Sequence, residues 1–168
     1  MEMTIFERSV EIKASPEEVF QLHLHPANLA RLMSPFIRSE IVAPYSPSRV
    51  GDTVTIVIRL PFIALKWEAA ITRVSEGLLE DVQVSGPFQS WRHEHRVEDI
   101  GGGRARLTDR VEFRFLPRAL GQLDHRLVKP LLALAFAHRH RKMVPLFQVP
   151  RHLAPEPHGH LAGPTELR

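Results

Sequence analysis

The sequence predicts an α+β domain in which a seven-stranded curved antiparallel sheet wraps around a long C-terminal helix, with two short helices after the first strand. Three observations predict this class. A strand pattern and a helix-start signal open the chain, short strands separated by turn residues fill its middle, and apolar residues recur at helical spacing near its end. We place the domain at residues 1–149 and expect residues 150–168 to form a flexible tail, because Pro, Gly and His dominate there.

Composition limits the kinds of site that the chain can build. Its 168 residues, 43% of them apolar, are enough for one core of ordinary size. Cysteine is absent, which excludes disulfides, thiolate zinc sites and a cysteine nucleophile. The N-terminal residues lack the apolar run of a signal peptide, and no segment approaches the ~18 apolar residues of a membrane span. We therefore expect a cytoplasmic protein with no stable membrane insertion.

The positive charge of the chain is weak and mostly local. The formal net charge is +3, and most of the excess lies in the run from His138 to Lys142. Cations in the last turns of a helix complement the helix dipole and need no ligand. A nucleic-acid site needs further cations and stacking aromatic residues on the same face, so we expect no nucleic-acid partner. A weak contact with a membrane surface stays open.

The first elements carry clear local signals. Thr4–Lys13 alternates apolar and charged residues, which is the period of a half-buried strand. Ser15, Pro16 and Glu18 then form a capping box with a proline at the first helical position, so a helix begins there. Pro26 interrupts this helix, and residues 28–33 are expected to form a second short one.

The middle of the chain alternates short apolar runs with turn residues. Consecutive strands joined by short connections pair antiparallel. The predicted strands are Ile37–Val42, Thr53–Arg59, Leu65–Val74, Leu78–Val84, Ser90–Val97 and Arg104–Phe115.

Charge tests the register of the last two predicted strands, because three glycines at 101–103 fix where they turn. When the residue numbers of facing partners add up to 204, opposite charges meet on one face: Glu98 with Arg106, Glu94 with Arg110, and Arg92 with Glu112. The other face then pairs Val97 with Leu107, His95 with Asp109, His93 with Val111, and Trp91 with Phe113. This register gathers two histidines and one aspartate on a mostly apolar face.

After Pro117 the apolar residues recur at three- and four-residue steps, which predicts a long amphipathic helix. Pro130 is expected to kink it, and Pro145 and Pro150 to limit its far end. The apolar residues that define the predicted inner face are Leu120, Leu123, Leu127, Leu131, Leu134 and Ala135.

Three segments resemble one superfamily. The entry from Ile12 to Phe20, the run from Gly86 to Arg96 and the segment from Thr108 to Glu112 are together similar to members of the START-related SRPBCC superfamily, in particular its bacterial polyketide cyclase/dehydrase-like branch. The resemblance covers about residues 3 to 147. It implies a helix-grip fold with a cavity between the sheet and the last helix, where such proteins bind lipids, sterols, polyketides or other apolar molecules.

The leading hypothesis is therefore a protein that binds a small hydrophobic ligand, such as a lipid, polyketide or aromatic molecule, in that cavity and uses no cofactor. Aromatic side chains collectively form a ligand wall when a curved sheet leaves space beside its helix. The residues expected to line the site are Trp67, Trp91, His93, His95, Asp109, Val111, Phe113, Phe62 and Leu131.

Other functions stay open from the sequence. His93, His95 and Asp109 are candidate acid/base groups of a cyclase- or dehydratase-like enzyme, or they satisfy one another in a mostly apolar sheet. The same three residues have the types of a metal site, but no further ligand is predicted on that face, so no metal is expected. A third possibility is an interaction module using the apolar segment 61–65, predicted as a loop or lid, or the basic helix end. Oligomeric state, monomer or dimer, is undecided.

Overall fold

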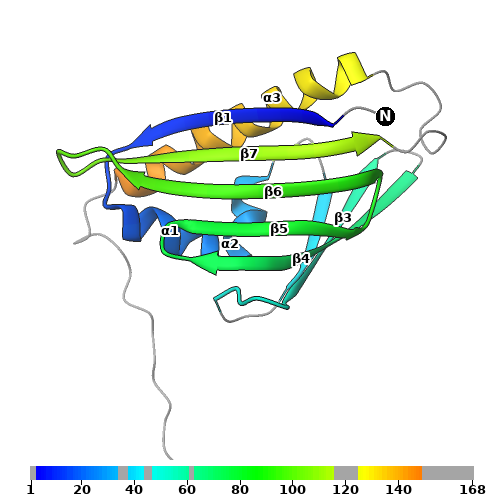
Figure 1. Cartoon of the computed structure of the whole chain (residues 1–168), viewed down its shortest axis with the longest axis horizontal. Coiled ribbons are helices and arrows are strands. Elements are labelled where there is room, and N and C mark those ends of the chain that lie inside the picture. Colours follow the sequence, from blue (N-terminus) through cyan, green and yellow to red (C-terminus); the bar gives the residue numbers. More distant parts are fainter. Residues whose placement is uncertain (1–2, 34–37, 44–46, 61–62, 116–124, 149–168) are drawn as a thin grey trace, which may run out of the picture.

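The computed structural model describes residues 3–33, 38–43, 47–60, 63–115 and 125–148 (Figure 1). The predicted tail lies outside these ranges. The strands are β1 (Thr4–Ile12), β2 (Arg38–Val42), β3 (Thr53–Leu60), β4 (Ile63–Ser75), β5 (Leu78–Ser85), β6 (Phe88–Asp99) and β7 (Ala105–Phe115). The helices are α1 (Pro16–Leu24), α2 (Ala27–Leu32) and α3 (His125–Met143), and the 3-10 helix η1 (Val144–Phe147) follows α3.

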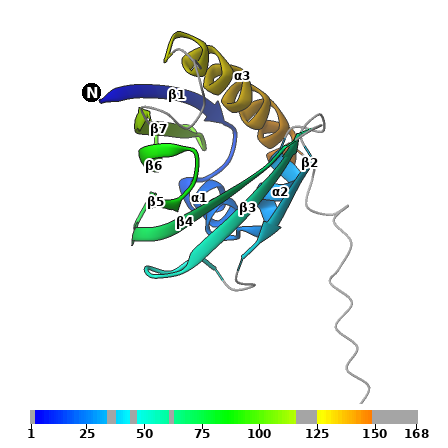
Figure 2. The same cartoon turned by 90° about the vertical axis from the view of Figure 1, so that its right-hand side faces the viewer.

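The strands form one seven-stranded sheet in the order β1-β7-β6-β5-β4-β3-β2, and each neighbouring pair is antiparallel. The sheet curls around α1 and α2, while α3 lies beside β1 and reaches α2 (Figure 2). The predicted fold class is confirmed. Its topology brings the first strand of the chain next to the last one.

The start of α1 follows the capping signal in the sequence. The Glu18 amide donates to Ser15 Oγ at 3.3 Å, and the Ser15 amide donates to Glu18 Oε2 at 3.0 Å. Pro16 occupies the first turn, where its missing N–H costs nothing. The helix ends at Leu24, before Pro26, so both predicted signals are confirmed.

The predicted register of β6 and β7 is confirmed from Ser90 to Asp99, with Trp91 facing Phe113 and His95 facing Asp109. On the outer face the Arg92 guanidinium contacts Glu80 at 2.6 Å and Glu112 at 3.5 Å. Arg106 turns instead to Glu11 on β1, at 3.1 Å. The charges that favoured this register therefore belong to a wider ladder of ion pairs that extends onto β1 and β5.

One predicted loop is wrong in part. The apolar segment 61–65 was expected to connect two strands as a loop or lid, but β4 already begins at Ile63 and pairs with β3 from there. Ala64 faces Arg59 and Leu65 faces Ile58, so these residues belong to the sheet. A short apolar run such as residues 62–65 fits a strand as well as a loop. Pro61 and Phe62 lie outside the described residues.

The predicted apolar stripe of α3 is exposed where its side chains are described, while Leu120 and Leu123 lie outside the described residues. Leu131 and Leu134 are 56% and 66% exposed, and Ala135 is exposed as well. The buried side chains lie instead at four- and three-residue steps along another stripe: Val128, Leu132 in part, Phe136, His140 and Met143. Both stripes of this helix are apolar over residues 131–137, so helical period alone does not decide which one faces the sheet.

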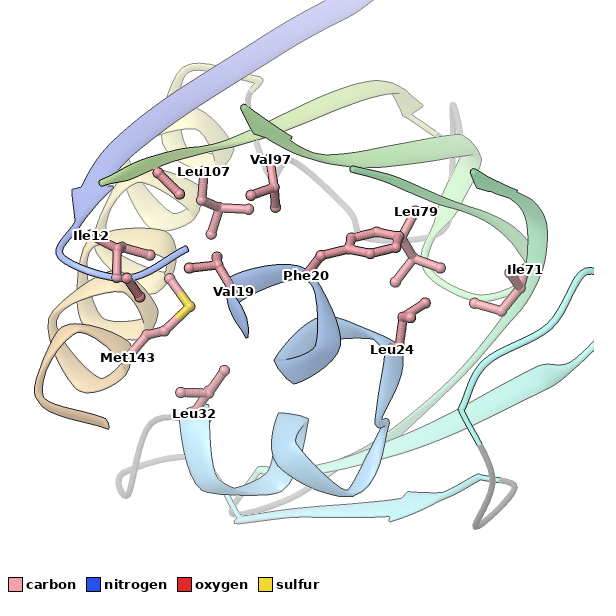
Figure 3. Packing of buried hydrophobic residues seen from close by; sticks show 12 residues of the cluster. Ile12, Val19, Phe20, Leu24, Leu32, Ile71, Leu79, Val97, Leu107 and Met143 are labelled. Atoms are coloured by element: carbon pink, nitrogen blue, oxygen red, sulfur yellow. The ribbon is translucent and has the colours of Figure 1, made fainter. Parts of the chain in front are cut away.

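A first apolar cluster fills the end of the sheet that α1 and α2 cover. In Figure 3 the side chain of Phe20 lies next to Leu79 of β5, and Val19 lies next to Met143 of α3. The buried members of this N-terminal cluster are Ile12, Ala14, Val19, Phe20, Leu24, Leu32, Ile71, Leu79, Val97, Ala105, Leu107 and Met143.

The turn between β4 and β5 offers a direct test of the packing. Gly77 has a φ of +65°, and a Cβ added there would lie 2.5 Å from the Val97 carbonyl oxygen. Gly101 has a similar φ of +77° but open space around it. We expect Gly101→Ala to lower the free energy of unfolding by ~1–2 kcal/mol from backbone strain alone, and Gly77→Ala to lower it clearly more. Guanidinium unfolding of both variants measures the difference, and equal losses would contradict the close approach to Val97.

Candidate functional site

A polar layer crosses the interior between two apolar clusters. Along β6, His93 and His95 separate Trp91 from Val97, and along β7 Asp109 separates Val111 from Leu107. On α3 His140 lies between Phe136 and Met143. In each element one apolar neighbour belongs to the N-terminal cluster and the other to a second, aromatic cluster.

The Asp109 carboxylate lies at the centre of this polar layer and is 0% exposed. Its Oδ1 is 3.2 Å from His93 Nε2 and 2.5 Å from His95 Nδ1. Its Oδ2 is 2.5 Å from His140 Nε2. An ionised carboxylate only accepts hydrogen bonds, so each of the three imidazoles donates an N–H to it.

Asp81 of β5 lies on the other side of the two β6 histidines. Its Oδ2 is 3.5 Å from His93 Nδ1 and 4.0 Å from His95 Nε2. The imidazole nitrogens that do not face Asp109 therefore face a second carboxylate. Asp81 keeps an 18% exposed side chain, which makes it the more open end of the layer.

The charges of the layer follow from burial and hydrogen bonding. Burial acts to raise the pKa of Asp109. The neighbouring imidazoles, with the largest contribution from His95, outweigh burial and hold the pKa of Asp109 well below its ordinary value. Burial also opposes charge on His93, yet its contacts with Asp109 and Asp81 raise its pKa. For His95, burial and the nearby His93 lower the pKa well below its ordinary value. The layer thus combines an ionised aspartate with a neutral His95.

His23 of α1 joins the layer from the helix side. Its ring centroid is 5.0 Å from that of His95, and its Nδ1 donates to the Val19 carbonyl oxygen at 2.8 Å. Its Nε2 is buried and has no hydrogen-bond partner among the described residues. Burial and then the charge of Arg139 lower the pKa of His23 to about 4. A neutral imidazole with an unused lone pair therefore lies beside His95.

The aromatic cluster lies on the opposite side of the layer from the N-terminal cluster. Trp91 is 4.7 Å from Trp67, 4.9 Å from Phe88 and 5.9 Å from Phe113, measured between ring centroids. Phe136 of α3 is 5.3 Å from the His93 ring. Trp91, Val111, Phe113 and Phe136 are buried, whereas Trp67 and Phe88 are only partly so.

The structure brings most of the sequence-predicted residues together. His93, His95 and Asp109 form the polar layer, and Trp67, Trp91, Val111 and Phe113 surround its aromatic side. Leu131 does not join them, because it lies on the exposed side of α3. Phe62 lies outside the described residues.

The sequence interpretation missed Asp81, His23, Phe88, Phe136 and His140. His140 was assigned to the exposed basic helix end, although it continues the buried stripe of Phe136 at a four-residue step. Asp81 follows Glu80 directly, and only the register with β6, which pairs Asp81 with His93, shows which of the two faces inward. His23 carried no signal beyond its place on a buried helix face.

The comparisons with known proteins agree with this geometry. The family described as polyketide cyclase / dehydrase and lipid transport matches residues 3–144. The chain belongs to this family. The comparison of this chain with curated proteins finds no match. In the described part of the chain, no helix combines the length and apolar character needed to cross a membrane.

Solved structures share the helix-grip fold of this family member at low sequence identity. A START superfamily protein from Mycobacterium smegmatis has a TM-score of 0.65 at 16% identity, covering 86% of this chain and 97% of its own. The ZhuI aromatase/cyclase from Streptomyces sp. R1128 has a TM-score of 0.63 at 14% identity, with 86% and 90% covered. Ginseng major latex-like protein 151 from Panax ginseng gives 0.62 at 14% identity, with 86% and 97% covered.

The buried His23 gives a prediction for pH. Its pKa falls from 6.5 to about 4 on folding. Above pH ~6.5 His23 is mostly neutral in both the folded and the unfolded state. Below that pH, His23 binds a proton in the unfolded chain but not in the folded protein. The free energy of unfolding therefore drops as the pH falls from ~6.5 to ~4, by roughly 3 kcal/mol for this group.

Replacing His23 by glutamine tests this contribution. We expect His23→Gln to flatten the fall in stability between neutral and acidic pH, as measured by urea unfolding at a series of pH values. The two curves should run parallel above pH ~7, where His23 is neutral in both states. An unchanged slope in the acidic range would show that this imidazole is not buried as described.

Proposed function

We propose that this family member binds a small apolar ligand, such as a lipid, polyketide or aromatic molecule, against the inner face of β3 and β4. The observation that carries the proposal is a gradient of burial along that face. Val54 and Ala69 are buried, whereas Ile56, Ile58 and Trp67 farther along the same face are only half-buried. Apolar side chains that remain half-exposed on the concave face of a sheet are a surface that a ligand can cover.

The ends of the proposed site differ in chemistry. Trp67 and Phe88 present partly buried rings, 5.6 Å apart, next to the half-buried aliphatic residues. Trp91 connects these rings to the polar layer, since it contacts Trp67 and lies 6.3 Å from the His93 ring. A ligand with an apolar body and one polar group fits such a surface, because the few polar groups of a pocket fix orientation.

The enzymatic alternative has one supporting observation, the hydrogen bond from His95 to Asp109. A general acid or base must reach the reacting atom. His95 is 5% exposed, and both of its ring nitrogens face carboxylates within the protein. This arrangement favours a ligand-orienting or structural role for His95, so cyclase- or dehydratase-like chemistry is the second candidate.

Two adjacent residues of β3 provide a matched test of binding. Ile56 faces Trp67 on the inner side, and Val57 faces Lys66 on the outer side. We expect Ile56→Ala to weaken binding of a fluorescent fatty acid by about tenfold, because it removes three carbons from the contact surface, each worth up to ~0.8 kcal/mol. Val57→Ala should bind as the wild type does.

Fluorescence titration measures both affinities, and native mass spectrometry of the freshly purified protein shows whether an apolar molecule is carried through purification. Equal effects of the two substitutions, or binding that neither changes, would place the ligand away from this face. A bound molecule whose mass changes on incubation, by loss of water for example, would favour the enzymatic alternative.

A further inference from the structure

His93, His95 and Asp81 present their remaining donor atoms to one point. Each residue offers one possible ligand atom, and the three atoms lie within 4.8 Å of one another. The distances to Asp81 Oδ2 are 3.5 Å from His93 Nδ1 and 4.0 Å from His95 Nε2. A tetrahedral zinc ion with bonds of ~2.0–2.1 Å holds its ligand atoms ~3.3 Å apart, so small side-chain rotations bring this set into range.

Asp109 prepares both histidines for such a role. Its Oδ1 accepts from His93 Nε2 and His95 Nδ1, which fixes the tautomers and leaves the opposite nitrogens as the lone-pair donors. Metal-binding histidines usually donate their other N–H to a carboxylate in this way, and the contact orients the ring and raises its basicity. Asp109 is itself held by His140 from α3.

We propose that Asp81, His93 and His95 bind a first-row divalent metal ion such as Zn²⁺, with Asp109 as the carboxylate that orients both histidines. Two imidazoles and one carboxylate suit such ions, and three protein ligands leave coordination positions for water or a ligand oxygen. None of the three ligands lies on β3, so the metal site and the apolar binding surface can be tested independently.

His23 supplies a second observation at this point. His23 is 8% exposed, its Nε2 is buried and lacks a hydrogen-bond partner among the described residues, and its ring lies 5.0 Å from the ring of His95. A buried acceptor of this kind normally has a partner. Water held by a metal ion beside His95 is a donor that suits it.

An extra proton on His93 is the competing interpretation. A protonated His93 donates to both carboxylates and satisfies the same contacts without a metal ion. The experiment therefore has to separate saturable metal binding from an electrostatic arrangement that needs none.

Calorimetric titration of the full-length, chelator-treated protein with Zn²⁺ tests the proposal. We expect one ion per chain in the site, and at least a tenfold loss of affinity in Asp81→Asn, which removes a ligand charge at a partly exposed position. Glu76→Gln is the matched carboxylate control, because Glu76 is exposed in the turn after β4. A second control, His158→Ala with His160→Ala, removes tail histidines that could bind zinc adventitiously. Both controls should retain wild-type affinity for the site.

Cobalt provides a readout on the wild-type protein that does not depend on how the variants fold. The NMR spectrum of the Co²⁺ complex should show two exchangeable, paramagnetically shifted imidazole N–H signals, from His93 Nε2 and His95 Nδ1. The proposal is overturned if the wild type shows no saturable binding, if Asp81→Asn binds as tightly as the wild type, or if binding is lost only with the tail histidines.

Discussion

Taking the Asp109 carboxylate out of water costs several kcal/mol, and the interior of this protein is arranged to offset that cost. Three imidazole N–H groups, two from β6 and one from α3, reach its two oxygens. Because the donors come from a neighbouring strand and from the C-terminal helix, the buried charge of Asp109 fixes the rotation of α3 about its axis relative to the sheet. Apolar contacts alone tolerate rotation of a helix about its axis, whereas a buried ion requires its donors in place.

The same layer divides the apolar interior into two parts with different character. The N-terminal cluster is closed by α1, α2 and Met143, and its members are buried. In the part of the chain that the structure describes, α3 is the helix that packs on the aromatic cluster, and Trp67 and Phe88 keep exposed surface. One part of the core stabilises the fold, and the other part supports the surface on which a ligand is proposed to bind.

Sequence reasoning located the sheet well because independent signals agreed there. The turn glycines and the cross-strand charges both pointed to one register of β6 and β7, and that register placed His95 beside Asp109. The capping box at Ser15 likewise specifies local hydrogen bonds between Ser15 and Glu18, and both are present in the structure. Where two signals coincided on one element, the prediction was confirmed.

The helix contribution to the site could not be predicted in the same way. Alternative stripes of α3 are apolar, and only the tertiary need of Asp109 for a third donor shows why His140 turns inward. Asp81 and His23 join through partners on β6, so their place depends on pairings that no local pattern contains.

The pairing of β1 with β7 has a consequence for how the chain is made. Ser9 and Thr108 share a hydrogen bond across 99 residues, so the strand that leaves the ribosome first has no partner until nearly the whole sheet has been synthesised. Contacts of such sequence separation slow folding, because a long loop must close before they form. During synthesis β1 is therefore an unpaired strand, and charged residues such as its Glu7, Arg8 and Glu11 are the kind that discourages an unpaired strand from pairing with other chains.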